Sequence, residues 1–130
     1  METTALVPRT APTRRVVYLA LALLIVASIV IEVVRHRTGY WQLGVFGVGP
    51  DLALLAGAGA GLTRGQIHPR AVPLYNALHR FWAPVVLLAL AGLGVAGVAY
   101  LIGALVWCFH ISFDRTVGYG LRTRDGFQRP

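Results

Sequence analysis

The chain has 130 residues, of which 56% are hydrophobic and only 13% charged, and its mean hydropathy is +0.64. Disorder is excluded because the chain is far too apolar for it. A soluble domain does not fit either, because soluble domains carry about 25% charged residues. A disulfide scaffold is excluded because Cys108 is the only cysteine, and a large two-domain enzyme is excluded by length. A small integral membrane protein remains.

The formal net charge of +7 comes from twelve cationic residues, all of them arginine. These arginines are scattered between apolar runs and do not gather into one basic stretch, which argues against a nucleic-acid partner. Arginines that flank apolar segments instead fix the orientation of a membrane protein and favour anionic lipid. We therefore expect membrane lipid, and no nucleic acid, as the partner.

The first predicted helix covers residues 16–34 and follows a polar stretch, residues 1–15, which we expect to be a disordered cytoplasmic tail. The run from Val16 to Val34 is almost wholly apolar, and 19 helical residues extend about 28 Å, enough to cross a bilayer core. A cleaved signal peptide is the alternative. The run is long for one, and no small-residue cleavage site follows it.

A second apolar stretch, residues 40–62, is predicted as a glycine-rich helix interrupted in its middle. Pro50 removes one backbone donor and frees the carbonyl of Phe46. A broken helix beside the carboxylate of Asp51 resembles the ion sites of transporters. The alternative is a simple kink in which Asp51 caps the second half. Gly57 and Gly61 have the spacing that lets helices approach closely in lipid.

The segment from Phe81 to Phe109 contains 29 residues without Arg, Asp, Glu or His. As one helix it would be about 44 Å long, well beyond a bilayer core of about 30 Å. Because Gly92, Gly94 and Gly97 offer a turn near its middle, we predict two helices, residues 71–91 and 94–116. A second cytoplasmic tail, residues 121–130, follows.

The sequence thus predicts an all-α, polytopic membrane protein whose residues 16–120 form four transmembrane helices in a small bundle. Four spans place the N-terminus, residues 63–70 and the C-terminus on one side, and the positive-inside rule makes that side cytoplasmic. We expect a multi-pass protein of the plasma (inner) membrane, and its lipid-facing surface is compatible with a homo-oligomer. The arginines of the cytoplasmic side are Arg9, Arg14, Arg15, Arg64, Arg70, Arg115, Arg122, Arg124 and Arg129; Arg35 and Arg37 are on the other.

Ionisable side chains inside membrane spans are costly, which makes them candidates for function. Asp51, His79, His110 and Asp114 all lie in the cytoplasmic half of the predicted spans, and His110 and Asp114 share a helix face. Two imidazoles with two carboxylates suit zinc or another divalent metal, which would activate water for hydrolysis. These four are the candidate catalytic residues and metal ligands. The candidate substrate-binding residues are Tyr75, Asn76, Arg80, Arg115 and Tyr119.

Other interpretations of these residues stay open. The same groups could relay protons, because imidazole titrates near neutrality. They could also be hydrogen-bonded pairs with a structural role, or bind haem between His79 and His110. The hypotheses are therefore a metal-dependent hydrolase acting on a lipid-like substrate, an ion- or proton-coupled transport element, and a non-catalytic bundle that organises lipid or assembles with partners.

Several motifs also resemble a known family. They are Gly49-Pro50-Asp51-Leu52, Leu74-Tyr75-Asn76-Ala77-Leu78-His79, His110-Ile111-Ser112-Phe113-Asp114-Arg115, Gly118-Tyr119-Gly120-Leu121 and Gly126-Phe127. With them, residues 39–127 resemble small bacterial membrane proteins catalogued as domain of unknown function 4260. That family usually has Lys where this chain has Arg122. The resemblance implies a helical membrane fold of about four spans and brings no activity, substrate or cofactor.

Overall fold

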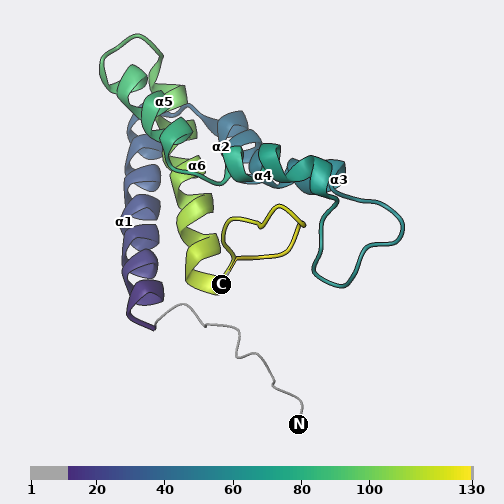
Figure 1. The fold of residues 1–130 in the computed structure, drawn as a ribbon. Coiled ribbons are helices and arrows are strands. Elements are labelled where there is room, and N and C mark those ends of the chain that lie inside the picture. Colours follow the sequence, from purple (N-terminus) through teal and green to yellow (C-terminus); the bar gives the residue numbers. More distant parts are fainter. Residues whose placement is uncertain (1–11, 130) are drawn as a thin grey trace.

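The computed structural model describes residues 12–129, which form an all-helical fold (Figure 1). Three segments are long and apolar enough to cross a membrane: Pro12–His36, Pro69–Gly92 and Val98–Val117. The prediction of an all-α membrane fold is confirmed. In chain order the helices are α1 (Pro12–His36), α2 (Tyr40–Val48), the 3₁₀ helix η1 (Gly49–Leu52), α3 (Ala53–Ala56), the 3₁₀ helix η2 (Pro69–Ala71), α4 (Val72–Leu78), α5 (Trp82–Gly92) and α6 (Val98–Val117).

Helix α1 runs alongside α6 over most of its length (Figure 1). Of its residues only Ala22 and Ile25 are buried, whereas large apolar side chains such as Leu23 and Leu24 are exposed. A helix that is apolar on its outer face belongs in lipid. Pro12–Arg15, part of the predicted N-terminal tail, belong to this helix, and residues 1–11 of that tail lie outside the described residues.

The second predicted helix, residues 40–62, is interrupted at Pro50 as its sequence predicts, but it ends earlier than residue 62. The chain forms α2, tightens into η1 at Gly49–Leu52, and ends its helix at Ala56. Pro50 causes the break, because it has no N–H to donate to the preceding turn. Gly57 then packs closely against the segment that follows: a Cβ there would lie 2.8 Å from Cβ of Ile67 and 3.4 Å from Cβ of Ala71 in η2.

The predicted hairpin is confirmed, since α5 and α6 lie side by side and the chain reverses between Gly92 and Val98 (Figure 1). Gly94 makes this turn with a φ of +77°, a conformation that favours glycine. The predicted helix 71–91 is broken between Leu78 and Trp82, because Pro84 cannot donate to the carbonyl of Arg80. As a result α4 lies across the bundle, whereas α5 runs along α6 (Figure 1).

The C-terminal segment, predicted as a tail over 121–130, packs back onto the helices as far as the structure describes it. Its residue Arg122 is buried and forms an isolated antiparallel bridge with Gln128. The amide N–H of Ile67 donates to the carbonyl of Gly126 at 3.0 Å. Gly118 faces the side chain of Arg15. The start of α1, residues 63–68 and the C-terminal segment therefore lie at the same end of the molecule.

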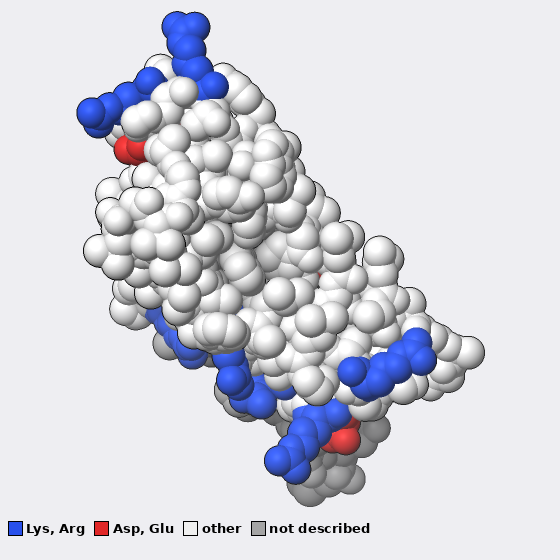
Figure 2. Space-filling model, turned by 90° about the horizontal axis from the view of Figure 1, so that it is seen from above, with Lys and Arg blue, Asp and Glu red and all other residues white. Residues whose placement is uncertain are grey.

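The face drawn in Figure 2 carries few charged side chains between its arginine clusters. Figure 2 shows arginine side chains gathered at separate places, with a wide uncharged surface between them. This distribution matches an apolar bilayer core between two polar interfaces.

We predict that Gly126→Ala destabilises the protein. Its φ is +93°, and an added Cβ would overlap the carbonyl oxygen of Ile67, so the C-terminal segment has to detach. A left-handed alanine alone costs about 1–2 kcal/mol. Thermal unfolding in detergent is expected to show a lower midpoint for this variant. Gly120→Ala is the matched control, because its Cβ would come no closer than 3.7 Å to Arg115; an equal loss in both variants would contradict the prediction.

Candidate metal centre

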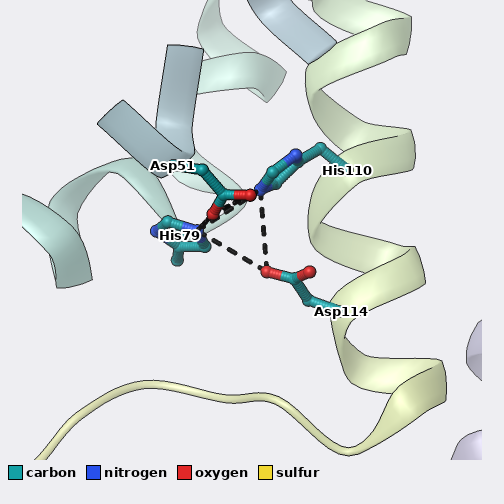
Figure 3. Close-up of side chains that lie close together, drawn as sticks. All are labelled: Asp51, His79, His110 and Asp114. Atoms are coloured by element: carbon teal, nitrogen blue, oxygen red, sulfur yellow. Dashed lines mark hydrogen bonds and ion pairs between the residues drawn. The ribbon is translucent and has the colours of Figure 1, made fainter. Parts of the chain in front are cut away.

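Four side chains from three separate elements meet inside the bundle (Figure 3). Asp51 comes from η1, His79 directly follows α4, and His110 and Asp114 lie one turn apart on α6. The four residues proposed from the sequence as one site are therefore brought together. One ligand atom from each lies within 4.8 Å of all the others.

The orientation of both histidine rings is fixed by backbone carbonyls. Nδ1 of His79 lies 2.8 Å from the carbonyl oxygen of Tyr75, and Nδ1 of His110 lies 2.8 Å from that of Gly47. A carbonyl can only accept, so both Nδ1 atoms carry the proton, and in a neutral ring Nε2 then has a free lone pair. This arrangement is typical of metal-binding histidines, whose second nitrogen donates to an outer partner.

The two Nε2 atoms face each other at 3.3 Å, and each also faces two carboxylates. His79 Nε2 lies 3.3 Å from Asp51 Oδ1 and 3.5 Å from Asp114 Oδ2. His110 Nε2 lies 3.4 Å and 3.6 Å from the same two oxygens. Four acceptor atoms therefore converge on one point, and acceptors at this spacing repel unless a cation or a shared proton lies among them.

The spacing of these atoms matches a tetrahedral metal site. Zinc binds nitrogen and carboxylate oxygen at about 2.0–2.2 Å, and a regular tetrahedron of that size has edges of about 3.3–3.6 Å. Five of the six edges, 3.3 to 3.6 Å, fall within this range, and the sixth, between the carboxylates of Asp51 and Asp114, is no longer than 4.8 Å. The donor set, two neutral imidazoles and two carboxylates, also suits zinc, and a divalent cation would balance both negative charges.

The ligands differ in their exposure. The side chain of His79 is fully buried, and those of His110 and Asp114 are only 9% and 15% exposed, whereas the Asp51 side chain is 47% exposed. Buried charges require pairing. Three candidate ligands are thus held within the protein, and the fourth, Asp51, is half-exposed.

An apolar groove of about 480 Å³ leads to Asp51. Helices α1, α2 and α6 form its walls, and the carboxylates of Asp51 and Asp114 and the ring of His110 lie at its polar end. Its apolar lining is Val26, Ile29, Val30, Leu43, Val106, Phe109 and Phe113.

The helix break before α5 is held by polar contacts. Trp107 Nε1 donates to the carbonyl of Leu78 at 2.8 Å, and the Arg115 guanidinium donates to the carbonyl of His79 at 2.8 Å. The ring of Tyr75 stacks on that of His79 with centroids 3.9 Å apart. The backbone carbonyls at the end of α4 thus have partners, which an apolar environment demands.

The structure places the candidate substrate-binding residues around the site in different roles. Tyr75 and Arg115 contact His79, as described above. Asn76 donates to the carbonyl of Arg122 at 3.0 Å and accepts from its N–H at 2.7 Å, so its amide joins α4 to the C-terminal segment. Arg80 is exposed in the helix break, and Tyr119 lines a separate pocket near the end of α6.

Sequence reasoning missed two groups that position the ligands. One is the carbonyl of Gly47, which orients His110 although the proline pattern pointed to the carbonyl of Phe46. The other is Trp107, whose indole N–H donates to the carbonyl of Leu78 next to His79. The signal for Gly47 was its place at the end of α2, where helix carbonyls lack intrahelical partners.

Together the fold and the cluster define a helical protein with membrane-spanning segments and a buried histidine–aspartate centre. The family described as Domain of unknown function (DUF4260) matches residues 15–130, and the chain belongs to this family. No curated protein matches the chain, and no solved structure does.

We predict that Asn76→Ala destabilises the fold without removing the metal ligands. The change leaves the buried N–H and carbonyl of Arg122 without their partner, which costs about 1–3 kcal/mol. The thermal midpoint is expected to fall, whereas the zinc content of the folded protein stays at the wild-type level. Loss of zinc at unchanged thermal stability would show instead that Asn76 acts on the centre.

Proposed function

We propose that this protein is an integral, multi-pass protein of the plasma membrane with a zinc-type centre that hydrolyses a lipid-like substrate. The observation that supports the metal is the convergence of four acceptor atoms from Asp51, His79, His110 and Asp114 at the spacing of a tetrahedral site. The proposal extends the family assignment, which carries no activity.

The proposed orientation puts both termini in the cytoplasm. Arg14 and Arg15 of α1, the arginines of residues 63–70 and those of the C-terminal segment lie at one end of the molecule. Arg35, in the last turn of α1, and Arg37, just after it, lie at the opposite end of that helix. Because cytoplasmic loops carry the excess of arginine, the richer end is the cytoplasmic one.

The four residues have two different proposed roles, binding the metal and activating the attacking water. His79, His110 and Asp114 are buried and would hold the metal. Catalytic zinc has three protein ligands and one open position, so Asp51 would leave the fourth position to water during hydrolysis. A metal bound there lowers the pKa of water and polarises a carbonyl or phosphoryl oxygen. Asp51 is half-exposed at the polar end of the groove, where its carboxylate can accept the proton of an attacking water.

The groove supports a substrate with an acyl chain. Its walls are apolar except at the end where Asp51, His110 and Asp114 lie. An apolar chain would occupy the groove and place a scissile polar bond at that end, because only the polar end offers hydrogen-bonding groups. Membrane lipid is thus the proposed source of the substrate.

Proton-coupled transport is the second candidate function, and the distance between the Nε2 atoms of His79 and His110 favours it. The two Nε2 atoms lie 3.3 Å apart, and a single proton between them would also relieve their repulsion. The helix break at Pro50 beside Asp51 resembles transporter sites in the same way. Metal content separates the candidates.

We predict about one zinc per chain in the purified protein, as a site with this donor set requires. His79→Ala and His110→Ala each remove one ligand and are expected to lose most of the metal. Elemental analysis by mass spectrometry measures it. His36→Ala is the control, because His36 pairs with Glu32 at 3.2 Å outside the cluster. A metal-free wild type after zinc loading would reject the centre and favour the proton relay.

We predict that Ile29→Trp blocks turnover and leaves the metal in place, because the indole fills the groove lined by Ile29. The readout is mass spectrometry of lipid extract incubated with zinc-loaded protein in nanodiscs, where the wild type is expected to release hydrolysis products. Leu24→Trp is the matched control, since Leu24 is exposed on the same helix and does not line the groove. Equal activity in both tryptophan variants would exclude the groove as the substrate site.

A further inference from the structure

A second pocket, distinct from the metal centre, lies where α1 begins and α6 ends. Its volume is about 170 Å³, far more than the roughly 15 Å³ that a single water needs. Three arginines line it: Arg14 from α1, Arg115 from α6 and Arg129 from the C-terminal segment. The backbone from Gly118 to Leu121 completes its wall.

The charge of this pocket is unbalanced. Among the residues that the structure describes, no carboxylate forms an ion pair with Arg14, Arg115 or Arg129. Arg115 lies within electrostatic reach of Arg14 and also of the neighbouring carboxylate of Asp114, which faces the groove and does not line this pocket. Like charges brought together around one cavity repel, and a bound anion removes that repulsion.

Two of the guanidinium groups are held in place by backbone carbonyls. Arg115 donates to the carbonyls of His79 and Tyr119, and Arg129 Nε donates to that of Arg122 at 3.1 Å. Arg14 lies over the ring of Tyr18, 5.9 Å from its centroid. Each guanidinium has five N–H donors in a planar fork, so donors remain on every arginine for an oxyanion.

We propose that this pocket binds a phosphate group. Planar guanidinium forks match the oxygens of phosphate in pairs, and three of them exceed what a single carboxylate uses. The pocket lies at the arginine-rich end of α1 and α6, which is the headgroup level of the proposed membrane orientation. The phosphate can therefore belong to an anionic lipid or to a soluble phosphate, and this inference does not depend on the metal centre.

The test compares two double variants of the full chain with equal loss of charge. Arg14→Gln/Arg129→Gln removes two pocket arginines, and Arg64→Gln/Arg124→Gln removes two exposed arginines that do not line it. Protein incubated with vesicles of equal phosphatidylglycerol and phosphatidylcholine is then re-isolated, and native mass spectrometry measures the lipid retained. A charge-assisted hydrogen bond contributes about 1.5–3 kcal/mol, so loss of the pocket arginines should lower phosphatidylglycerol retention by about tenfold or more.

A second arm titrates the same proteins with inorganic phosphate by calorimetry. Binding of inorganic phosphate that the pocket variant loses assigns the site to soluble phosphate, and retention of phosphatidylglycerol alone assigns it to a lipid headgroup. The inference is overturned if the wild type binds neither, or if the exposed-arginine variant loses as much as the pocket variant. Should the glutamine variant fail to fold, Arg14→Lys/Arg129→Lys keeps the charge and removes the paired geometry, and unchanged binding in that variant also overturns it.

Discussion

Two hydrogen bonds from histidine rings to backbone carbonyls are the constraint on which the centre depends. The Nδ1 atoms of His79 and His110 are each tied at 2.8 Å, one to Tyr75 and the other to Gly47. With both rings held on that side, their Nε2 lone pairs point at one another and at the carboxylates of Asp51 and Asp114. If either carbonyl moved, the ring would be free to turn and the four acceptor atoms would no longer converge.

The carbonyl groups that orient the ligands come from helix ends. These carbonyls lack intrahelical hydrogen-bond donors, and leaving them unpaired in an apolar environment costs free energy. An unpaired backbone group in lipid costs several kcal/mol, so irregular backbone persists there only where protein groups satisfy it. At the end of α4 the partners are Trp107 and Arg115, and at the end of α2 the partner is His110 itself. The same contacts that make the helix breaks tolerable thus position the ligands, which couples the stability of the breaks to the geometry of the centre.

Two consecutive residues of α6, Asp114 and Arg115, belong to the candidate metal centre and to the arginine pocket. Asp114 faces the apolar groove, and Arg115 faces the pocket near the end of the helix. Arg115 also donates to the backbone of His79. An anion that draws on Arg115 would therefore act on the same guanidinium that supports a ligand, and this shared residue is the physical link between the two proposed sites.

The sequence by itself determined the membrane class, the first span, the hairpin of α5 and α6, and the four residues of the centre. These depend on run length, charge and helical spacing, because a bilayer imposes a fixed thickness and a high cost on charge along each segment. The break of the second helix at Pro50 was also expected from the sequence, whereas tertiary structure alone decided which carbonyls orient the rings and that the C-terminal segment returns onto Asn76. These depend on contacts between residues far apart in the chain, such as Gly47 with His110 and Asn76 with Arg122, and no local pattern records which distant group will satisfy a freed backbone atom.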